Sequence, residues 1–402
     1  MTATGCAANL PKLYAIRLLF WMHFFSAVLV PFYTEWGGIT LQQVFLLNAW
    51  FFLCNFLFEV PTGTVADFLG RKWSLTLGSA VAVLGVFLYA SAPRIEVFVF
   101  AETIMAVAYT LHSGADEALA YDSLKADGRQ ALAAAVIGRM EAFKLGGIVT
   151  ATILGGFVAA RFGLRAPMLV TAVPAALAMV LALTLREPAQ SATGGERRSY
   201  LHILREGGRR FARHPVIRLL AVEAAITNAL AWGIIWLFQP LLRRALVPLQ
   251  AFGVVHALGC LAQIAFLSGI PALEQWAGSR RRLILLATLA SGAAFLSLAA
   301  TTSWPLVVAG IVAGMAFSLP RVPLFNAAIN QHVDSSERAT VLSFCSMVRT
   351  LAIVVMNPLT GLVAQRSLDA ALLMMGASLI VLALASRVGD EHLAELQQTR
   401  DG

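Results

Sequence analysis

Long apolar stretches alternate with short polar breaks along the whole chain, and this pattern predicts membrane-spanning helices. Stretches near or above about 20 residues, the length that crosses a hydrocarbon core, recur from one end to the other. A β-barrel is not expected, because the apolar run from Leu283 to Ala300 does not alternate with a period of two residues. Twelve helices are predicted between the charged, glycine and proline breaks, at residues 12–33, 40–62, 74–92, 95–123, 130–160, 165–185, 215–240, 249–273, 282–300, 304–330, 337–364 and 368–386.

The composition agrees with an all-α membrane protein. Of the 402 residues, 58% are hydrophobic and 13% are charged, whereas a soluble domain carries about 25% charged residues. The longest polar interruption runs from Glu187 to His214 and divides the helices six and six. We therefore predict four parts, namely an N-terminal six-helix bundle at 1–186, a cytoplasmic linker at 187–213, a C-terminal six-helix bundle at 214–387 and a cytoplasmic tail at 388–402.

The net charge of +8 comes from basic residues in the short loops between apolar helices. With a cytoplasmic N-terminus, the inner loops receive most of these residues, and the positive-inside rule then puts both termini in the cytoplasm. The arginines of the central linker are equally compatible with binding to anionic lipid headgroups. Membrane topology accounts for the charge, so a nucleic-acid partner is not expected.

An internal repeat supports two pseudo-symmetric halves. The pattern L-x-G-x-V-A-x-R occurs at Leu154–Arg161 and again at Leu359–Arg366, about half a chain later. Each copy follows a polar loop and an intramembrane arginine, Arg139 in the first half and Arg349 in the second. The fifth predicted helix therefore corresponds to the eleventh, and the fourth to the tenth.

The segment from Glu59 to Lys72 carries the most specific motif. Within it, Gly63, Asp67, Gly70, Arg71 and Lys72 match G-x-x-x-D-x-x-G-R-K, and the segment resembles the signature of the major facilitator superfamily. Glycines there permit close helix approach and a tight turn. The alternative is an ordinary basic turn between two helices.

The resemblance to this superfamily implies a fold, a latch and a packing motif. The implied fold is two six-helix bundles. Asp67 is expected to meet the start of the helix at 337–364, and Arg71 to pair with Asp122, as a latch that stabilises the outward-open state. The second-half segment Gly278–Arg281 lacks the aspartate, so the latch is expected on one side only. The fifth helix resembles the antiporter motif of the superfamily without its Gly-Pro pair, through Gly138, Gly147, Gly155 and Gly156. Tight structural packing is the alternative role of these glycines.

The fourth predicted helix is unusually polar for a membrane span. It contains Asp116 and Glu117, which point about 100° apart. Two roles are open: a structural network with Arg71, Arg139 or Lys144, and proton coupling by a carboxylate that has no partner. Further candidates for the cavity or for proton coupling are Arg17, Glu141, Arg321 and Arg349, and Glu102 and Glu223 are weaker ones.

These residues predict a secondary active transporter that works by alternating access. We expect proton-coupled efflux of a small amphiphilic compound, because the polar run of the fourth helix also resembles a bacterial branch of the superfamily with many predicted exporters. Uptake or facilitated transport of an anionic metabolite is the alternative, and a nontransporting membrane sensor is a third. No phosphate-binding loop, catalytic constellation or metal-ligand cluster is visible, so an enzyme, a cofactor and a metal site are not expected. The expected partners are a small-molecule substrate, protons and membrane lipid, for a monomer in the bacterial inner membrane.

Overall fold

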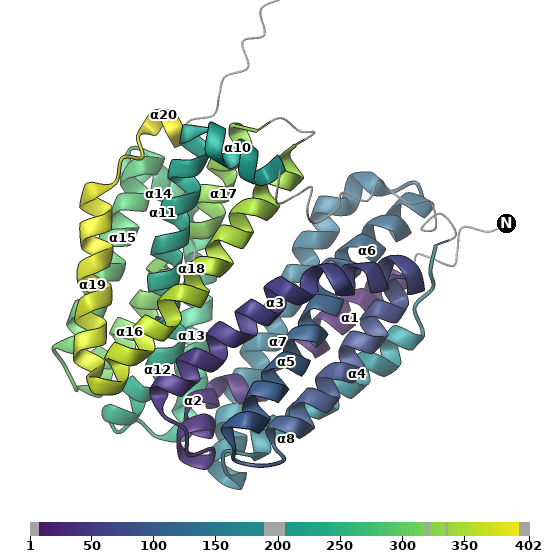
Figure 1. The fold of residues 1–402 in the computed structure, drawn as a ribbon, viewed down its shortest axis with the longest axis horizontal. Helices are drawn as coiled ribbons and strands as arrows, with labels where there is room; N and C mark the ends of the chain where they lie inside the picture. The colour runs from purple at the N-terminus through teal and green to yellow at the C-terminus, as the bar shows by residue number, and fades with distance from the viewer. Residues whose placement is uncertain (1–7, 189–205, 319–320, 334–336, 394–402) are drawn as a thin grey trace, which may run out of the picture. The chain divides into compact units, whose positions relative to one another are not determined.

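The computed structural model describes residues 8–188, 206–318, 321–333 and 337–393. Within these ranges every regular element is a helix. Residue contacts divide the chain into two compact units (Figure 1): unit 1 is Met1–Arg197 with Val247–Ala257, and unit 2 is Arg198–Leu246 with Leu258–Gly402. The predicted limits of the two bundles, the linker and the tail stay a prediction. Most of the linker and residues 394–402 of the tail lie outside the described residues.

Unit 1 contains the helices of the first half of the chain. They are α1 (Asn9–Phe20), η2 (Phe24–Ala27), α2 (Leu29–Pro31), η3 (Phe32–Trp36), α3 (Leu41–Leu69), α4 (Arg71–Tyr89), α5 (Ile95–His112), α6 (Ala115–Ala126), η4 (Gln130–Leu132), α7 (Ala133–Phe162) and α8 (Ala166–Leu183). The start of α13 (Leu249–Ser268) also belongs to this unit, because it packs on α7. There the side chains of Thr152 and His256 form a hydrogen bond of 2.9 Å.

Unit 2 contains the rest of α13 and the remaining helices. They are α10 (Gly208–Arg213), α11 (Pro215–Trp232), α12 (Ile234–Arg244), α14 (Ile270–Ala277), α15 (Arg280–Ala299), α16 (Trp304–Ser318), α17 (Arg321–Gln331), α18 (Arg338–Arg366), α19 (Leu368–Ala385) and α20 (Asp390–Leu393).

The helices have the length and composition of membrane spans. Among the described residues, 11 helices are long and apolar enough to cross a membrane, and Asn9–Ala27 with Leu29–Trp36 makes a twelfth if this bent pair counts as one span. Large apolar side chains point outward in each unit, for example Phe157 and Leu177 in unit 1 and Leu384 in unit 2, which are 52%, 53% and 72% exposed. The predicted all-α membrane fold is confirmed, and lipid has to cover these faces.

Within the described residues, four predicted helices are broken where continuous helices were expected, so the predictions for 12–33, 95–123, 215–240 and 249–273 are wrong in this respect. The first bends by 62° between the two members of the bent pair. The second divides into α5 and α6 at Gly114, whose φ of +73° suits a residue without a Cβ. The third divides into α11 and α12 at Gly233, and the fourth into α13 and α14 at Gly269.

A helix break inside a membrane leaves backbone groups that need new partners. In the first span, where α1 ends and η2 begins, the backbone N–H of Phe24 donates to Oγ1 of Thr171 on α8 at 3.1 Å. This side chain supplies the acceptor that an unbroken helix would have provided.

Glycines of α7 allow helix backbones to approach closely within unit 1. A Cβ at Gly155 would lie 1.9 Å from the carbonyl oxygen of Phe24, and one at Gly147 would lie 2.4 Å from that of Leu18. Gly156 faces Gln250 at the start of α13 in the same way, at 2.8 Å. Gly138 differs, because a Cβ there would meet open space. The expectation of tight packing at Gly138 therefore does not hold in this conformation.

The close approach at Gly155 predicts a large loss of stability in Gly155→Ala. The added methyl group would overlap a backbone oxygen that cannot move aside, so we expect the free energy of unfolding to fall by about 3 kcal/mol. Gly146→Ala, in the same helix with open space at its Cβ, is the matched control and should gain up to about 1 kcal/mol from helix propensity. Thermal unfolding in detergent measures both, and equal melting temperatures would contradict the packing argument.

Candidate functional site

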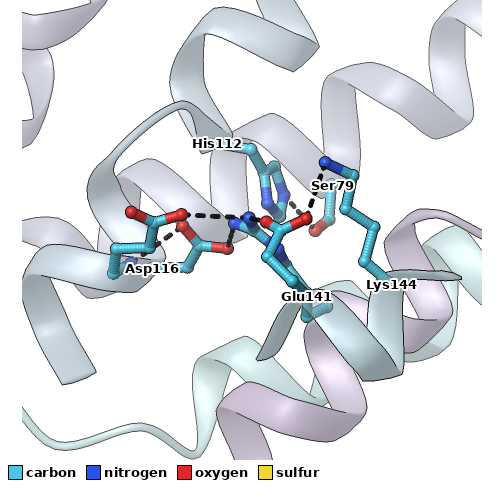
Figure 2. A network of polar contacts seen from close by, with 7 residues as sticks. Ser79, His112, Asp116, Glu141 and Lys144 are labelled. Carbon is cyan, nitrogen blue, oxygen red and sulfur yellow. Dashed lines mark hydrogen bonds and ion pairs between the residues drawn. The ribbon is translucent and has the colours of Figure 1, made fainter. Parts of the chain in front are cut away.

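A cluster of charged side chains lies inside unit 1, next to the break between α5 and α6 (Figure 2). The cluster takes Arg17 from α1, Asp116 and Glu117 from the start of α6, and Glu141 and Lys144 from α7. All of these residues belong to membrane-spanning segments. Ionisable groups at such depth are costly unless they are paired or face water.

Arg17 is the centre of this cluster. Its Nη1 donates to Asp116, and its Nη2 donates both to Glu117 at 3.0 Å and to Glu141. The side chains of Arg17 and Asp116 are 11% and 3% exposed, whereas those of Glu117 and Glu141 are 39% and 42% exposed. One guanidinium with its planar fork of donors can serve several carboxylates at once. The pair with Asp116 is thus the buried part of the network, and the other two carboxylates form its accessible edge.

The local fold of α6 explains why two acids can stand at this break. The helix restarts after Gly114, so Asp116 and Glu117 fall in its first turn, where the backbone N–H groups are free and the helix dipole favours negative charge. Oδ1 of Asp116 accepts from the N–H of Glu117 at 2.8 Å. On the other side of the break, His112 closes the end of α5 by stacking on Phe20 and by a hydrogen bond of 3.0 Å to Ser79.

Lys144 and Arg139, both on α7, have different surroundings. Lys144 donates to Glu141 at 3.2 Å and lies over the ring of Trp21, with 4.5 Å from Nζ to the ring centroid. Arg139 is exposed and lies over the ring of Tyr14, 5.8 Å from its centroid. Of the three cations considered for the network, Arg139 is thus not paired with Asp116 or Glu117 in this conformation, whereas Arg71 is paired with Asp122.

Neither Asp116 nor Glu117 is unpaired in this conformation, because Arg17 holds both, so of the two open roles the paired network is the one seen here. Sequence spacing alone could not identify this partner, since Arg17 and Asp116 are 99 residues apart. The only sign of this partner in the sequence was a lone arginine in the first predicted apolar span.

This arrangement contains more acids than bases. Three carboxylates share two cations, Arg17 and Lys144, and two of the three carboxylates are half accessible to solvent. A proton on one carboxylate would free a donor of Arg17 for another acceptor. The network can thus exchange partners without leaving its one buried acid, Asp116, unpaired.

The motif residues expected to form a latch lie at the end of α3 and the start of α4. Arg71 donates to the carboxylate of Asp122 and to the carbonyl oxygen of Ala118, the latter at 2.7 Å. Gly70 connects the two helices with a φ of +93°, in the region that favours glycine. Lys72 lies over the ring of Trp73, 5.7 Å from its centroid.

The other two motif residues, Gly63 and Asp67, form neither a close helix contact nor an ion pair with the described residues of unit 1. A Cβ at Gly63 would meet open space, so the close helix approach expected there is absent in this conformation. Asp67 is exposed and forms no ion pair with the described residues of its unit. Its contact with the helix at 337–364 of the other unit stays a prediction.

Glu187 was missed as a member of this region. Its carboxylate accepts from the backbone N–H of Arg71 at 2.7 Å and from that of Lys72 at 3.0 Å, and so caps the start of α4. A capping carboxylate satisfies free N–H groups and interacts favourably with the helix dipole. An acid placed directly after a predicted span on the same membrane side as the motif was the signal that could have identified it.

The two candidate arginines of unit 2, Arg321 and Arg349, bind different partners. Arg321, at the start of α17, is 2% exposed and donates from Nε to the carbonyl oxygen of Ser318 and from Nη1 to Thr288. Arg349 on α18 donates to Asn326 and Ser346, each at 3.1 Å. Neither arginine has a carboxylate within ion-pair distance among the described residues of unit 2.

Glu102 on α5 is a buried acid with no cation beside it in the described part of unit 1. It is 6% exposed and accepts from the hydroxyl group of Tyr33 at 2.7 Å. Tyr89 at the end of α4 is a second neutral neighbour of this carboxyl group. Both tyrosines are buried, so this carboxyl group is held by neutral donors only.

The central position of Arg17 predicts a large effect of Arg17→Gln. Removing the cation leaves Asp116 buried without a counter-charge, so we expect the free energy of unfolding to fall by about 3–5 kcal/mol. The double variant R17Q/D116N removes both charges and should recover most of the loss. Arg139→Gln is the control, because that side chain is exposed. Unfolding in detergent measures all three, and equal stability of R17Q and R139Q would contradict the argument.

The cap on α4 predicts a smaller effect of Glu187→Gln. The variant keeps the shape of the side chain but removes the charge at the helix start, which should cost about 0.5–1 kcal/mol. Glu96→Gln, an exposed acid in the first turn of α5, is the matched control and should change stability less. The comparison is made by thermal unfolding at low salt, and no difference between the two would show that the cap is not stabilising.

Comparison with known proteins agrees with this architecture. A mutant form of the nucleoside transporter NupG superposes with a TM-score of 0.81 at 15% identity over 95% of this chain and 98% of its own. A bacterial homologue of the human lysosomal transporter Spinster, inward-facing and unoccupied, gives 0.71 at 18% identity over 96% and 95%. A D-xylose-proton symporter gives 0.73 at 13% identity over 96% and 99%.

Sequence comparison is narrower than structural comparison for this chain. No curated protein sequence matches it. The family profile described as "Major Facilitator Superfamily" matches residues 13–276. Because this match covers more than half of the chain, the protein belongs to the major facilitator superfamily, whose members are membrane transporters and not enzymes.

Proposed function

We propose that this protein is a secondary active transporter that exports a small amphiphilic compound in exchange for protons, by alternating access. The observation that carries the proposal is the cluster in which Arg17 binds Asp116, Glu117 and Glu141 beside a helix break inside the spanning segments. Such groups are retained at membrane depth where they handle ions or substrate. Directional transport requires a gradient, and protons are the simplest ion that a carboxylate network binds.

The surroundings of the cluster support an amphiphilic substrate with a positive charge. Glu117 and Glu141 are partly exposed, and α1 and α7 also carry aromatic rings: Tyr14 stacks on Phe143 with 5.2 Å between centroids, and Trp21, directly after α1, carries the ammonium group of Lys144 on its face. Carboxylates next to aromatic faces recognise organic cations. A cationic substrate and protons would then compete for the same carboxylates, which is the requirement for their exchange.

The close packing of α7 supports efflux through the resemblance to the antiporter motif. Three of its four motif glycines stand where a Cβ would overlap a neighbour. The pairing of Arg71 with Asp122 supports a latch at the end of α3 and α4 that opens and closes during the cycle. The D-xylose-proton symporter among the similar structures is a proton-coupled protein with this fold.

Transport of an anionic metabolite is the second candidate, and one observation favours it. Nη2 of Arg321 is buried and has no hydrogen-bond partner in the described part of the chain. A substrate carboxylate could supply that acceptor. Arg17 does not favour this candidate, because its charge is already matched by three acids of its own unit.

We place the protein in the bacterial inner membrane as a monomer, with both termini in the cytoplasm. The basic residues of α10 and of the turn before α15 support this orientation through the positive-inside rule.

Proton-driven flux is the test of the proposed function. In energised inverted vesicles, the wild-type protein should accumulate a lipophilic aromatic cation such as ethidium and lose this uptake when a protonophore collapses the gradient. Asp116→Asn and Glu117→Gln should lose proton-driven flux while they remain folded, because each removes a carboxylate that binds Arg17. Uptake of benzoate in place of ethidium would favour the anionic candidate, and unchanged flux in both variants would remove these acids from coupling.

A further inference from the structure

The two units contain corresponding charged pairs of opposite polarity. Arg17 lies eight residues after the start of α1, and Glu223 lies eight residues after the start of α11. The partner of Arg17 is Asp116, in the first turn of α6, and the residue 205 positions later is Arg321, the first residue of α17. This spacing equals the distance between the two copies of L-x-G-x-V-A-x-R.

A further correspondence shows that the halves share more than these two positions. Lys144 lies 11 residues after the start of α7, and Arg349 lies 11 residues after the start of α18. Lys144, and not Arg139 as expected, is therefore the first-half counterpart of Arg349. The repeat thus preserves the places of these charges, although it exchanges acid and base between α1 and α6 on one side and α11 and α17 on the other.

The two pairs differ in their state. In unit 1 the arginine and the aspartate are bonded. In unit 2 both oxygens of the Glu223 carboxyl group accept from Oγ of Ser386, at 2.8 and 2.9 Å, and no ion pair joins Glu223 to Arg321 among the described residues. Arg321 has only neutral acceptors, Ser318 at 3.1 Å and Thr288 at 2.8 Å.

Arg321 is left with an incomplete set of partners. Its side chain is almost fully buried, and Nη2 has no acceptor in the part of the chain that the structure describes. A buried guanidinium whose charge is not matched by a carboxylate is unfavourable, and an unmade hydrogen bond adds to the cost. Among the cations on the helices packed against α11, Arg349 on α18 is bonded to Asn326 and Ser346, whereas Arg321 on α17 retains a buried donor without an acceptor in the described part of the chain.

We infer that Glu223 is the proton-binding residue of unit 2, and that Arg321 receives its carboxylate when the proton leaves. The O–H bond of the Glu223 carboxyl group breaks, the proton passes to water, and the carboxylate exchanges Ser386 for Nη2 of Arg321. Proton binding reverses each step. Glu223 is partly exposed, so water can reach it, whereas Arg321 is 2% exposed and is better placed for an acid of its own unit than for a transported anion.

This inference rests on the proposed proton-coupled transport and identifies a second proton site for it. Unit 1 would carry a closed charge network and unit 2 an open pair, so that the two halves of one repeat respond differently to the same gradient. A ligand shifts a conformational equilibrium only by its differential affinity for the two states. A proton satisfies this condition at Glu223, because it binds the state in which Arg321 and Glu223 are apart.

Infrared difference spectroscopy between neutral and alkaline pH tests the proton site directly. Every protein in this experiment is reconstituted in lipid vesicles and carries the background substitution Glu102→Gln. Glu102 is a second buried acid held by neutral donors, and its carbonyl band would otherwise overlap that of Glu223. We expect the carbonyl band of a protonated carboxyl group to disappear at alkaline pH in this background, to be absent altogether in E223Q, and to persist at alkaline pH in R321Q. Glu274→Gln, which removes an acid already paired with Arg280, is the control and should keep the band of the background.

Arg321→Lys keeps the positive charge and should retain the loss of the band, so it replaces R321Q if that variant does not fold. A band that is unchanged by E223Q overturns the inference, as does an R321Q spectrum identical to that of the background. Loss of benzoate binding in R321Q, with a band insensitive to E223Q, would assign Arg321 to an anionic substrate and also overturn it.

Flux through the same vesicles separates this inference from the proposed function. Ethidium transport by E223Q should lose its dependence on the proton gradient but retain exchange of ethidium across the membrane. Retained gradient dependence in E223Q overturns the coupling role of Glu223. A wild-type protein that moves neither ethidium nor benzoate refutes the proposed transport, and the spectral result for E223Q then decides the proton site by itself.

Discussion

The burial of charge in a medium without water is the constraint on which the rest of this structure depends. Arg17 is held inside a membrane-spanning bundle because Asp116, Glu117 and Glu141 surround it, and each of those acids depends on the arginine in turn. The network contains one deeply buried pair and two accessible carboxylates. That division lets the protein keep its stability in the buried pair while the accessible carboxylates exchange partners.

Helix breaks and glycines make room for such a network. The break at Gly114 puts two acids at a helix start, where free N–H groups and the helix dipole favour negative charge. Close contacts of α7 at Gly147 and Gly155 keep α1 near α7, so that Arg17 can reach Glu141. Packing and electrostatics are therefore coupled: a bulkier residue in α7 would move the arginine away from one of its partners.

The two halves of the chain use one plan with different chemistry. Arg17 and Glu223 occupy equivalent places on α1 and α11, and Asp116 and Arg321 lie 205 residues apart in the first turns of α6 and α17. In unit 1 the charges are joined, whereas in unit 2 neutral hydroxyl and carbonyl groups hold them apart. Because the two halves have different charge pairs, the same helix rearrangement has different electrostatic consequences in each half. Directional transport requires such a difference.

The sequence by itself determined the membrane class, the number of spans and the family, because apolar length and the motif from Gly63 to Lys72 are local properties of the chain. It also proposed the pair of Arg71 and Asp122. The tertiary structure decided which acids Arg17 holds, left Arg139 outside the network, and brought Glu187 to the start of α4. These contacts join residues about a hundred positions apart, and their geometry depends on helix breaks and rotations that a pattern of apolar residues does not encode.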